Sequence, residues 1–97
     1  MSCFFCRYDK GKIVGLLGIR LKEGHICFFF VDGEYHRRGI GRSLFEFVMR
    51  SVSIRPITLN SSPYGLPFYR AIGFKEASGE QTVNGIRFTP MVFGEGV

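Results

Sequence analysis

The first third of the chain consists of short apolar runs separated by glycine and charged residues. The runs lie at 3–8, 13–21 and 25–31, and the separators are Asp9-Lys10-Gly11-Lys12 and Lys22-Glu23-Gly24. Runs of this length between turn-forming residues predict three strands joined by tight turns. Gly15 and Gly18 indicate a weak point or a bulge in the second strand. The third run shows no polar alternation over 28–31, so we expect a central strand with both faces covered.

A helical spacing follows. Polar side chains spaced four, four and three residues apart form one solvated stripe: Arg42, Glu46, Arg50 and Ser53. The apolar residues between them form the inward face: Leu44, Phe45, Val48, Met49 and Val52. This pattern predicts a helix over 40–52. Arg55-Pro56 ends the helix, and 56–60 is a short strand. Because a helix connects it to the third strand, we expect these two strands to be parallel.

The next segment predicts a second, shorter helix. Ser61-Ser62-Pro63 supplies a cap and a proline that the first turn tolerates, and the helix covers 64–72. Gly73 stands where a left-handed residue ends a helix.

The tail reads as two strands, at about 74–82 and 86–93, around the hairpin signal Val83-Asn84-Gly85. No linker or repeat interrupts the chain, so we expect a single domain over 1–97.

Composition narrows the function. With 45% hydrophobic residues, eleven of them Phe, the 97-residue chain should fold. A net charge of +5 favours an anionic partner, but three arginines fall within 36–42, which indicates one anion site rather than a nucleic-acid surface. No apolar stretch reaches 18 residues and no signal peptide is recognisable, so we expect no membrane association and a cytoplasmic protein. Cys3-x-x-Cys6 has no second pair, so we expect no metal site.

The candidate chemistry lies in His36-Arg37-Arg38-Gly39-Ile40-Gly41-Arg42, between the third strand and its helix. We call residues 36–41 the glycine loop. Glycines let a diphosphate approach the backbone, helix-terminal N–H groups bind it, and arginines add paired donors. The segment is neither a GxGxxG fingerprint nor a P-loop. Alone, such a turn is more often a solvated connection.

Three local patterns together resemble the GNAT family of acyl-CoA-dependent N-acetyltransferases. The glycine loop is similar to the family's Q/R-x-x-G-x-G/A loop. Residues 59–74 are similar to its strand-Asn and Pro-Phe-Tyr-x-x-x-Gly-Phe pattern, and 84–91 to its terminal hairpin. The resemblance implies an α+β fold of order β-β-β-α-β-α-β-β, with a mainly antiparallel mixed sheet and a central parallel pair.

The resemblance also implies site residues. Those expected to bind acetyl-CoA are Phe29, Phe30, Val31, His36, Arg37, Arg38, Gly39, Ile40, Gly41, Arg42, Asn60, Pro67 and Phe68. Tyr69 occupies the family's position for the acid that protonates the CoA thiolate; the alternative is a half-buried aromatic residue. Asn60 either caps its strand or bonds a pantetheine amide.

Two departures from the family limit this interpretation. His36 replaces the usual Gln or Arg, and only a short strand precedes the turn at 9–12, so the chain looks like a truncated or minimal member. No carboxylate lies in 26–31 to act as general base, so the base stays unassigned.

We therefore expect an acetyl-CoA-dependent N-acetyltransferase that acts by direct attack in a ternary complex. Its acceptor, a small-molecule amine or a peptide, is not identified by the sequence. The alternative is a non-catalytic acyl-CoA-binding or sensing module, and a nucleic-acid-binding module is a third, less favoured reading. An open sheet face would expose apolar side chains, so we expect a homodimer.

Overall fold

The computed structural model describes residues 2–35 and 39–94. The chain divides into two compact units, Met1–Ile54 and Arg55–Val97, which we call the N-terminal and C-terminal units. Neither described helix is long and apolar enough to cross a membrane.

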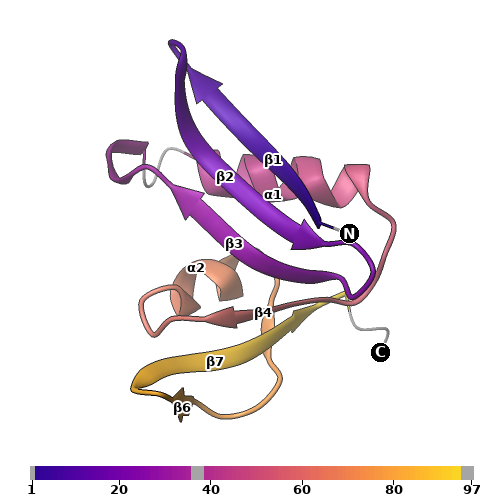
Figure 1. Cartoon of the computed structure of the whole chain (residues 1–97), viewed down its shortest axis with the longest axis vertical. Coiled ribbons are helices and arrows are strands. Elements are labelled where there is room, and N and C mark those ends of the chain that lie inside the picture. Colours follow the sequence, from indigo (N-terminus) through magenta and orange to yellow (C-terminus); the bar gives the residue numbers. More distant parts are fainter. Residues whose placement is uncertain (1, 36–38, 95–97) are drawn as a thin grey trace. The chain divides into compact units, whose positions relative to one another are not determined.

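The N-terminal unit is an antiparallel sheet of three strands with one long helix (Figure 1). Its elements are β1 (Ser2–Asp9), β2 (Lys12–Arg20), β3 (His25–Val31), the 3₁₀ turn η1 (Gly33–Tyr35) and α1 (Ile40–Ser51). The three strands and the helix predicted from the sequence are confirmed. The β1–β2 turn has positive φ at both Lys10 (51°) and Gly11 (78°), the geometry of a tight hairpin.

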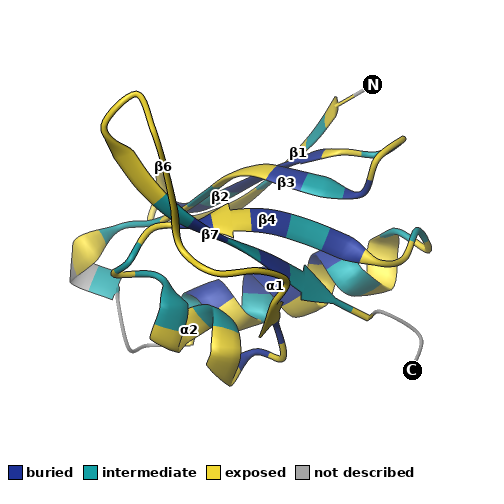
Figure 2. Ribbon diagram, turned by 90° about the horizontal axis from the view of Figure 1, so that it is seen from below, coloured by how far each residue is buried: buried dark blue, intermediate teal, exposed yellow. Residues whose placement is uncertain are grey.

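Helix α1 packs against one face of this sheet, as Figure 2 also shows. A Cβ placed on Gly15 would lie 3.2 Å from Leu44 and 3.3 Å from Ile40, so this glycine lets the helix approach the strand closely. The buried core of the unit consists of Val14, Leu17, Ile19, Ile26, Leu44, Phe45 and Val48. The inward face predicted for the helix is therefore largely confirmed, with Met49 and Val52 only half-buried.

The other face of the sheet carries exposed aromatic side chains. Phe4, Gly18 and Phe28 are partners across the three strands, and a Cβ on Gly18 would lie 2.8 Å from the Phe4 ring. The strand register shifts between Gly18 and Ile19, which confirms a bulge at this glycine.

The prediction that both faces of the third strand are covered is wrong. Phe28 is 48% exposed and Phe30 is 45% exposed. The physical reason is that α1 covers only one face, so the apolar run reflects an apolar open face rather than a second covering layer.

The C-terminal unit is built around one long strand. Its elements are β4 (Ile57–Ser61), α2 (Leu66–Ala71), β5 (Lys75–Glu76), β6 (Gln81–Val83) and β7 (Ile86–Phe93). Strand β7 pairs antiparallel with β4, β5 and β6. Positive φ at Asn84 (52°) and Gly85 (78°) confirms the predicted hairpin turn.

The prediction of a single strand over 74–82 is wrong. This segment forms two short strands instead, β5 and β6. Between them Ser78 and Gly79 interrupt the pairing, and the Gln81 side chain donates to Ser78 Oγ (3.1 Å). Serine and glycine favour turns over strands, so the interruption follows from local chemistry.

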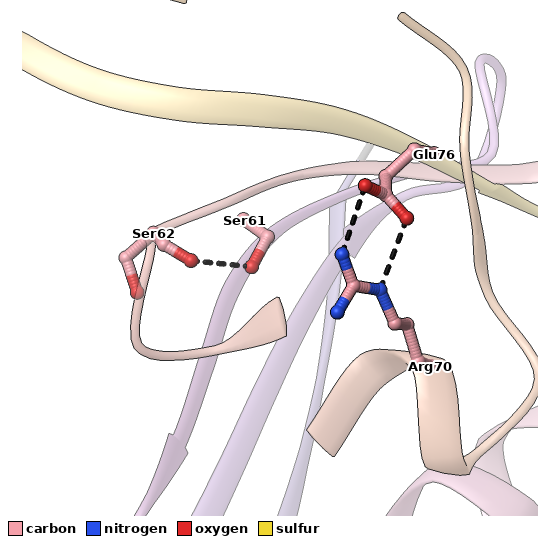
Figure 3. Close-up of polar contacts among 4 residues, drawn as sticks. All are labelled: Ser61, Ser62, Arg70 and Glu76. Carbon is pink, nitrogen blue, oxygen red and sulfur yellow. Dashed lines mark hydrogen bonds and ion pairs between the residues drawn. The ribbon is translucent and has the colours of Figure 1, made fainter. Parts of the chain in front are cut away.

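The second helix is shorter than the predicted 64–72 and begins after Gly65, not after the serines. Ser62 instead caps the turn that lies just before α2, where its hydroxyl oxygen accepts a hydrogen bond from the Gly65 N–H (3.2 Å). The Ser61 hydroxyl, which is buried, donates to the carbonyl oxygen of Ser62 (2.7 Å; Figure 3).

The end of α2 is as predicted. Gly73 has φ 113°, its N–H donates to the carbonyl of Arg70 (3.1 Å), and the N–H of Phe74 donates to the carbonyl of Tyr69 (2.9 Å). This pair of bonds is a Schellman motif.

Candidate functional site

Helix α1 begins at a left-handed glycine. Gly39 has φ 78° and ψ 6°, and its carbonyl accepts the Ser43 N–H (2.9 Å). The N-cap makes no side-chain hydrogen bond, and the first turn carries no acidic residue. The first N–H groups of a helix have no intrahelical acceptor, so such an N-terminus favours an anion. A Cβ on Gly39 would meet open space, so the glycine is needed for its backbone conformation.

Two arginines lie at this positive end of the helix. Arg42 is in the first turn, where it pairs loosely with Glu46 (4.0 Å). Arg7 reaches the same turn from β1, and its Nη1 donates to Ser43 Oγ (3.2 Å). Cations are unfavourable near a helix N-terminus, so a bound anion would offset their repulsion. Sequence reasoning missed Arg7 because it lies outside the glycine-loop pattern.

Strand β3, which leads to the glycine loop, pairs with β2 up to its last residue. Phe29 pairs with Leu17, and Val31 pairs with Gly15. The ladder extends one residue further, since the Asp32 N–H donates to the carbonyl of Val14 (2.9 Å). Phe29, Phe30 and Val31 therefore form a regular strand directly before the turn, as predicted.

Tyr69 lies on α2 within a small aromatic cluster. Its ring meets Phe68 edge-on at 5.3 Å between centroids and Phe74 at 5.7 Å. A Cβ on Gly65 would lie 2.9 Å from the Tyr69 ring, so this glycine makes room for it. Burial raises the pKa of Tyr69 above its ordinary value, so the phenol stays protonated at neutral pH. A half-buried phenol of this kind can donate a hydrogen bond or a proton.

An ion pair ties the helix that carries Tyr69 to β5. The Arg70 guanidinium donates to both carboxylate oxygens of Glu76, at 3.0 and 2.9 Å (Figure 3). This bidentate contact lowers the pKa of the Glu76 carboxyl. Both side chains are exposed, so the pair orients α2 more than it stabilises the fold.

The remaining expected residues fall into three groups. Asn60 lies on β4 opposite Pro90 and is exposed; the strand continues to Ser61, so Asn60 does not end it. Pro67 and Phe68 are exposed on α2. His36, Arg37 and Arg38 lie outside the described residues.

The N-terminal unit thus carries the predicted strand residues on β3 and the predicted helix-start residues at the beginning of α1: Phe29, Phe30, Val31, Gly39, Ile40, Gly41 and Arg42. The C-terminal unit carries Asn60 on β4 and Pro67, Phe68 and Tyr69 on α2, where the rings of Phe68 and Tyr69 are in contact. Within residues 2–35 and 39–94, no group of three or more His, Cys, Asp or Glu side chains is arranged to hold a metal ion.

Comparison with known proteins gives consistent matches. The acetyltransferase (GNAT) domain profile matches residues 1–94. A glucosamine 6-phosphate N-acetyltransferase from Trypanosoma brucei brucei is 31% identical, the match covering 73% of this chain. The chain spans about half the length of that curated relative, 56%.

Solved structures agree on the fold. A GCN5-related N-acetyltransferase structure from Rhodopseudomonas palustris matches with a TM-score of 0.81 at 18% identity, over 95% of this chain and 61% of that one. An aminoglycoside 6'-N-acetyltransferase complexed with coenzyme A matches with a TM-score of 0.79 at 15% identity, over 94% of this chain and 71% of that one. The predicted α+β class with a GNAT-like fold is confirmed.

Proposed function

Because the chain belongs to the GNAT acetyltransferase family, we propose that it transfers an acetyl group from acetyl-CoA to a primary amine. The observation that carries the proposal is the start of α1, where a left-handed glycine, an uncapped helix N-terminus and two arginines favour an anion. The diphosphate of CoA is such an anion. The similarity to a structure complexed with coenzyme A supports this choice.

The proposed reaction is direct transfer in a ternary complex. The neutral amine nitrogen attacks the thioester carbonyl carbon, a C–N bond forms, and negative charge develops on the carbonyl oxygen. The C–S bond then breaks, CoA leaves as a thiolate, and the amine nitrogen gives up one proton. A backbone N–H in the stretch Phe30, Val31 and Asp32 would stabilise the developing oxyanion, and since the Asp32 N–H already donates to the carbonyl of Val14, the donor would come from Phe30 or Val31. No side chain is assigned as base, and ordered water would accept the proton of an amine of modest pKa.

Tyr69 is the proposed acid for the departing thiolate. Its phenol is held protonated by burial, and the aromatic contacts with Phe68 and Phe74 fix its ring. The backbone also holds Tyr69, because its carbonyl accepts a hydrogen bond in the Schellman motif and its ring lies close to Gly65.

The glycine loop, the strand 29–31, Asn60, Pro67 and Phe68 would then bind acetyl-CoA. The backbone of 37–42 would bind the diphosphate and the strand would bind the pantetheine arm. The acceptor, a small-molecule amine or a peptide, stays open.

The alternative function is an acyl-CoA-binding or sensing module without catalysis. The observation that favours it is the third strand, which offers no carboxylate over 26–31 for the usual general base. Such a module would bind CoA with normal affinity and never release thiol.

The deciding experiment has two arms. Calorimetric titration with acetyl-CoA and CoA at moderate salt measures binding, and a thiol-reactive chromophore follows CoA release with a panel of primary amines. Binding with amine-dependent thiol release is the expected result. Binding without release from any amine would favour the sensing module, and absence of binding would end both proposals.

We also propose that the protein is a homodimer, with the open face of the N-terminal sheet at the interface. Phe4 (64% exposed) and Phe28 lie side by side on that face. Exposed aromatic patches of this kind favour association. Sedimentation should show a dimer at micromolar concentration, and Phe4→Ser with Phe28→Ser should give a monomer. Ile86→Ser, an exposed apolar residue of the β6–β7 hairpin, should leave the dimer intact; a monomeric unmodified protein would refute the proposal.

We further propose that residues 1–97 act as one domain in the cytoplasm. A family match over 1–94 supports one domain, and three cysteines without a disulfide (Cys3, Cys6 and Cys27) are compatible with a reducing compartment.

A further inference from the structure

The glycine loop is flanked by two residues that both contact the end of β1. Tyr35, the last residue of η1, precedes the loop, and Ser43, in the first turn of α1, follows it. Asp9 contacts the first and Arg7 contacts the second. Two residues of one strand therefore touch both sides of the loop.

The contact before the loop is the shorter one. The Tyr35 hydroxyl donates to Asp9 Oδ2 at 2.6 Å in a partly buried position. A hydrogen bond to a carboxylate at this distance is among the stronger kinds in proteins. The Tyr35 N–H also donates to the carbonyl of Asp32 (2.8 Å), so the turn that carries the hydroxyl is itself closed.

A second contact holds the start of the same turn. Lys12, the β-hairpin partner of Asp9, forms an ion pair with Asp32 (3.1 Å). The lysine is largely exposed, so this pair contributes little by itself. Asp9 and Lys12 are partners at the tip of the β1–β2 hairpin. Together they contact both ends of the turn, since Lys12 contacts Asp32 and Asp9 contacts Tyr35.

The contact after the loop comes from Arg7. Its guanidinium donates to Ser43 Oγ (3.2 Å) on the first turn of α1. Arg7 and Asp9 are separated by one residue, and both lie at the end of β1, next to the register shift between Arg7 and Tyr8. The end of β1 therefore contacts Tyr35, which precedes the glycine loop in sequence, and Ser43, which follows it.

We propose that the end of β1 is a clamp that positions the start of α1, with Asp9, Arg7 and Tyr35 as positioning residues for acyl-CoA binding. This inference rests on the proposed function of the loop. The clamp fixes the approach to the loop and the start of the helix, so the backbone donors are arranged before the ligand arrives. Losing the clamp lets the first turn of α1 adopt more positions and lowers the fraction of molecules that is ready to bind.

The test compares two tyrosine hydroxyl deletions, one of them a control, and a double-mutant cycle between Asp9 and Tyr35. Tyr35→Phe should raise the dissociation constant of CoA, measured by calorimetry, about fivefold. Asp9→Ala should have a similar effect, and the double variant should be no weaker than the weaker single variant, because both remove one bond. Tyr64→Phe, on a 94% exposed side chain, is the matched control and should bind CoA normally.

A second readout separates positioning from general destabilisation. Amide hydrogen exchange over 39–43 should speed up in Tyr35→Phe, while exchange in the C-terminal unit stays unchanged. If the protein catalyses transfer, the KM of Tyr35→Phe for acetyl-CoA should rise, while its kcat and its KM for the amine should stay unchanged.

The outcomes are distinguishable. If the unmodified protein binds CoA and Tyr35→Phe binds it equally well, the clamp is wrong and the proposed function stands. If Asp9→Ala and Tyr35→Phe add as independent losses, the two residues do not act through one bond and the clamp is wrong. If the unmodified protein does not bind CoA, the proposed function fails, and unchanged exchange over 39–43 in Tyr35→Phe would then remove the clamp as well.

Discussion

Replacing Tyr69 with phenylalanine tests the proposed chemistry most directly, because it removes one oxygen and leaves the ring. The edge-on contacts with Phe68 and Phe74 involve the ring alone and are retained. The fold and the affinity for acetyl-CoA should therefore change little. What is lost is the proton or hydrogen bond offered to the departing thiolate.

The magnitude follows from the environment of the phenol. Burial raises the pKa of Tyr69 above about 10, while a free thiol has a pKa of about 8.5. Full proton transfer to a thiolate with that pKa would be uphill, so the phenol acts mainly by hydrogen-bonding the developing charge. A hydrogen bond to a charged group contributes roughly 1.5–3 kcal/mol, which corresponds to a fall in kcat of about 10- to 100-fold.

The assay is initial-rate thiol release at saturating acetyl-CoA with the best amine of the panel. Tyr64→Phe is again the control, since it loses an equivalent hydroxyl at an exposed position of the same unit. A kcat for Tyr69→Phe within about twofold of the unmodified protein would refute the proposed role of the hydroxyl at the departing thiolate. A parallel loss of CoA affinity would assign the hydroxyl to binding instead.

Two further predictions concern stability. Gly73→Ala should lower the free energy of unfolding by about 2 kcal/mol, because φ is 113° and the new Cβ would lie 2.9 Å from the Phe93 ring; urea denaturation measures this, and Gly79→Ala, whose Cβ meets open space, should be close to neutral. Burial, and next the charge of Arg20, lower the pKa of His25, so protonation opposes folding and stability should fall as pH drops below about 6.5. Denaturation at pH 8 and 5.5 checks this; an equal loss of stability in His25→Gln would show that other groups cause it.

The strands of the N-terminal unit and the tight turns of both units could be predicted from the sequence because their signals are local. Lys10-Gly11 and Asn84-Gly85 adopt the left-handed conformations that a two-residue hairpin requires. The Gly73 helix end is local in the same way. The observed strand boundaries differ from the predicted ones where turn-forming residues fall within a predicted strand, as at Ser78-Gly79.

Burial of the third strand could not be predicted, because composition alone does not reveal which face another element covers. Phe28 and Phe29 are equally apolar, and only the position of α1 makes one exposed and the other half-buried. The same limit applies to Arg7 and Asp9. Their partners lie 36 and 26 residues away, and no pattern within a short window links them.

The residues proposed for binding and the residue proposed for chemistry can be tested by different measurements, affinity for acyl-CoA and turnover. The N-terminal unit carries the start of α1, which is proposed to bind acyl-CoA, and the β1 clamp, which is proposed to position it. The C-terminal unit carries Tyr69, whose proposed role is confined to the departing thiolate. Three conservative variants should therefore fall into three classes: Tyr35→Phe changes affinity, Tyr69→Phe changes turnover, and Tyr64→Phe changes neither. Since each variant removes one phenolic oxygen, a general effect of losing a hydroxyl cannot produce this pattern. If Tyr35→Phe and Tyr69→Phe changed the same parameter, binding and chemistry would not be divided in this way.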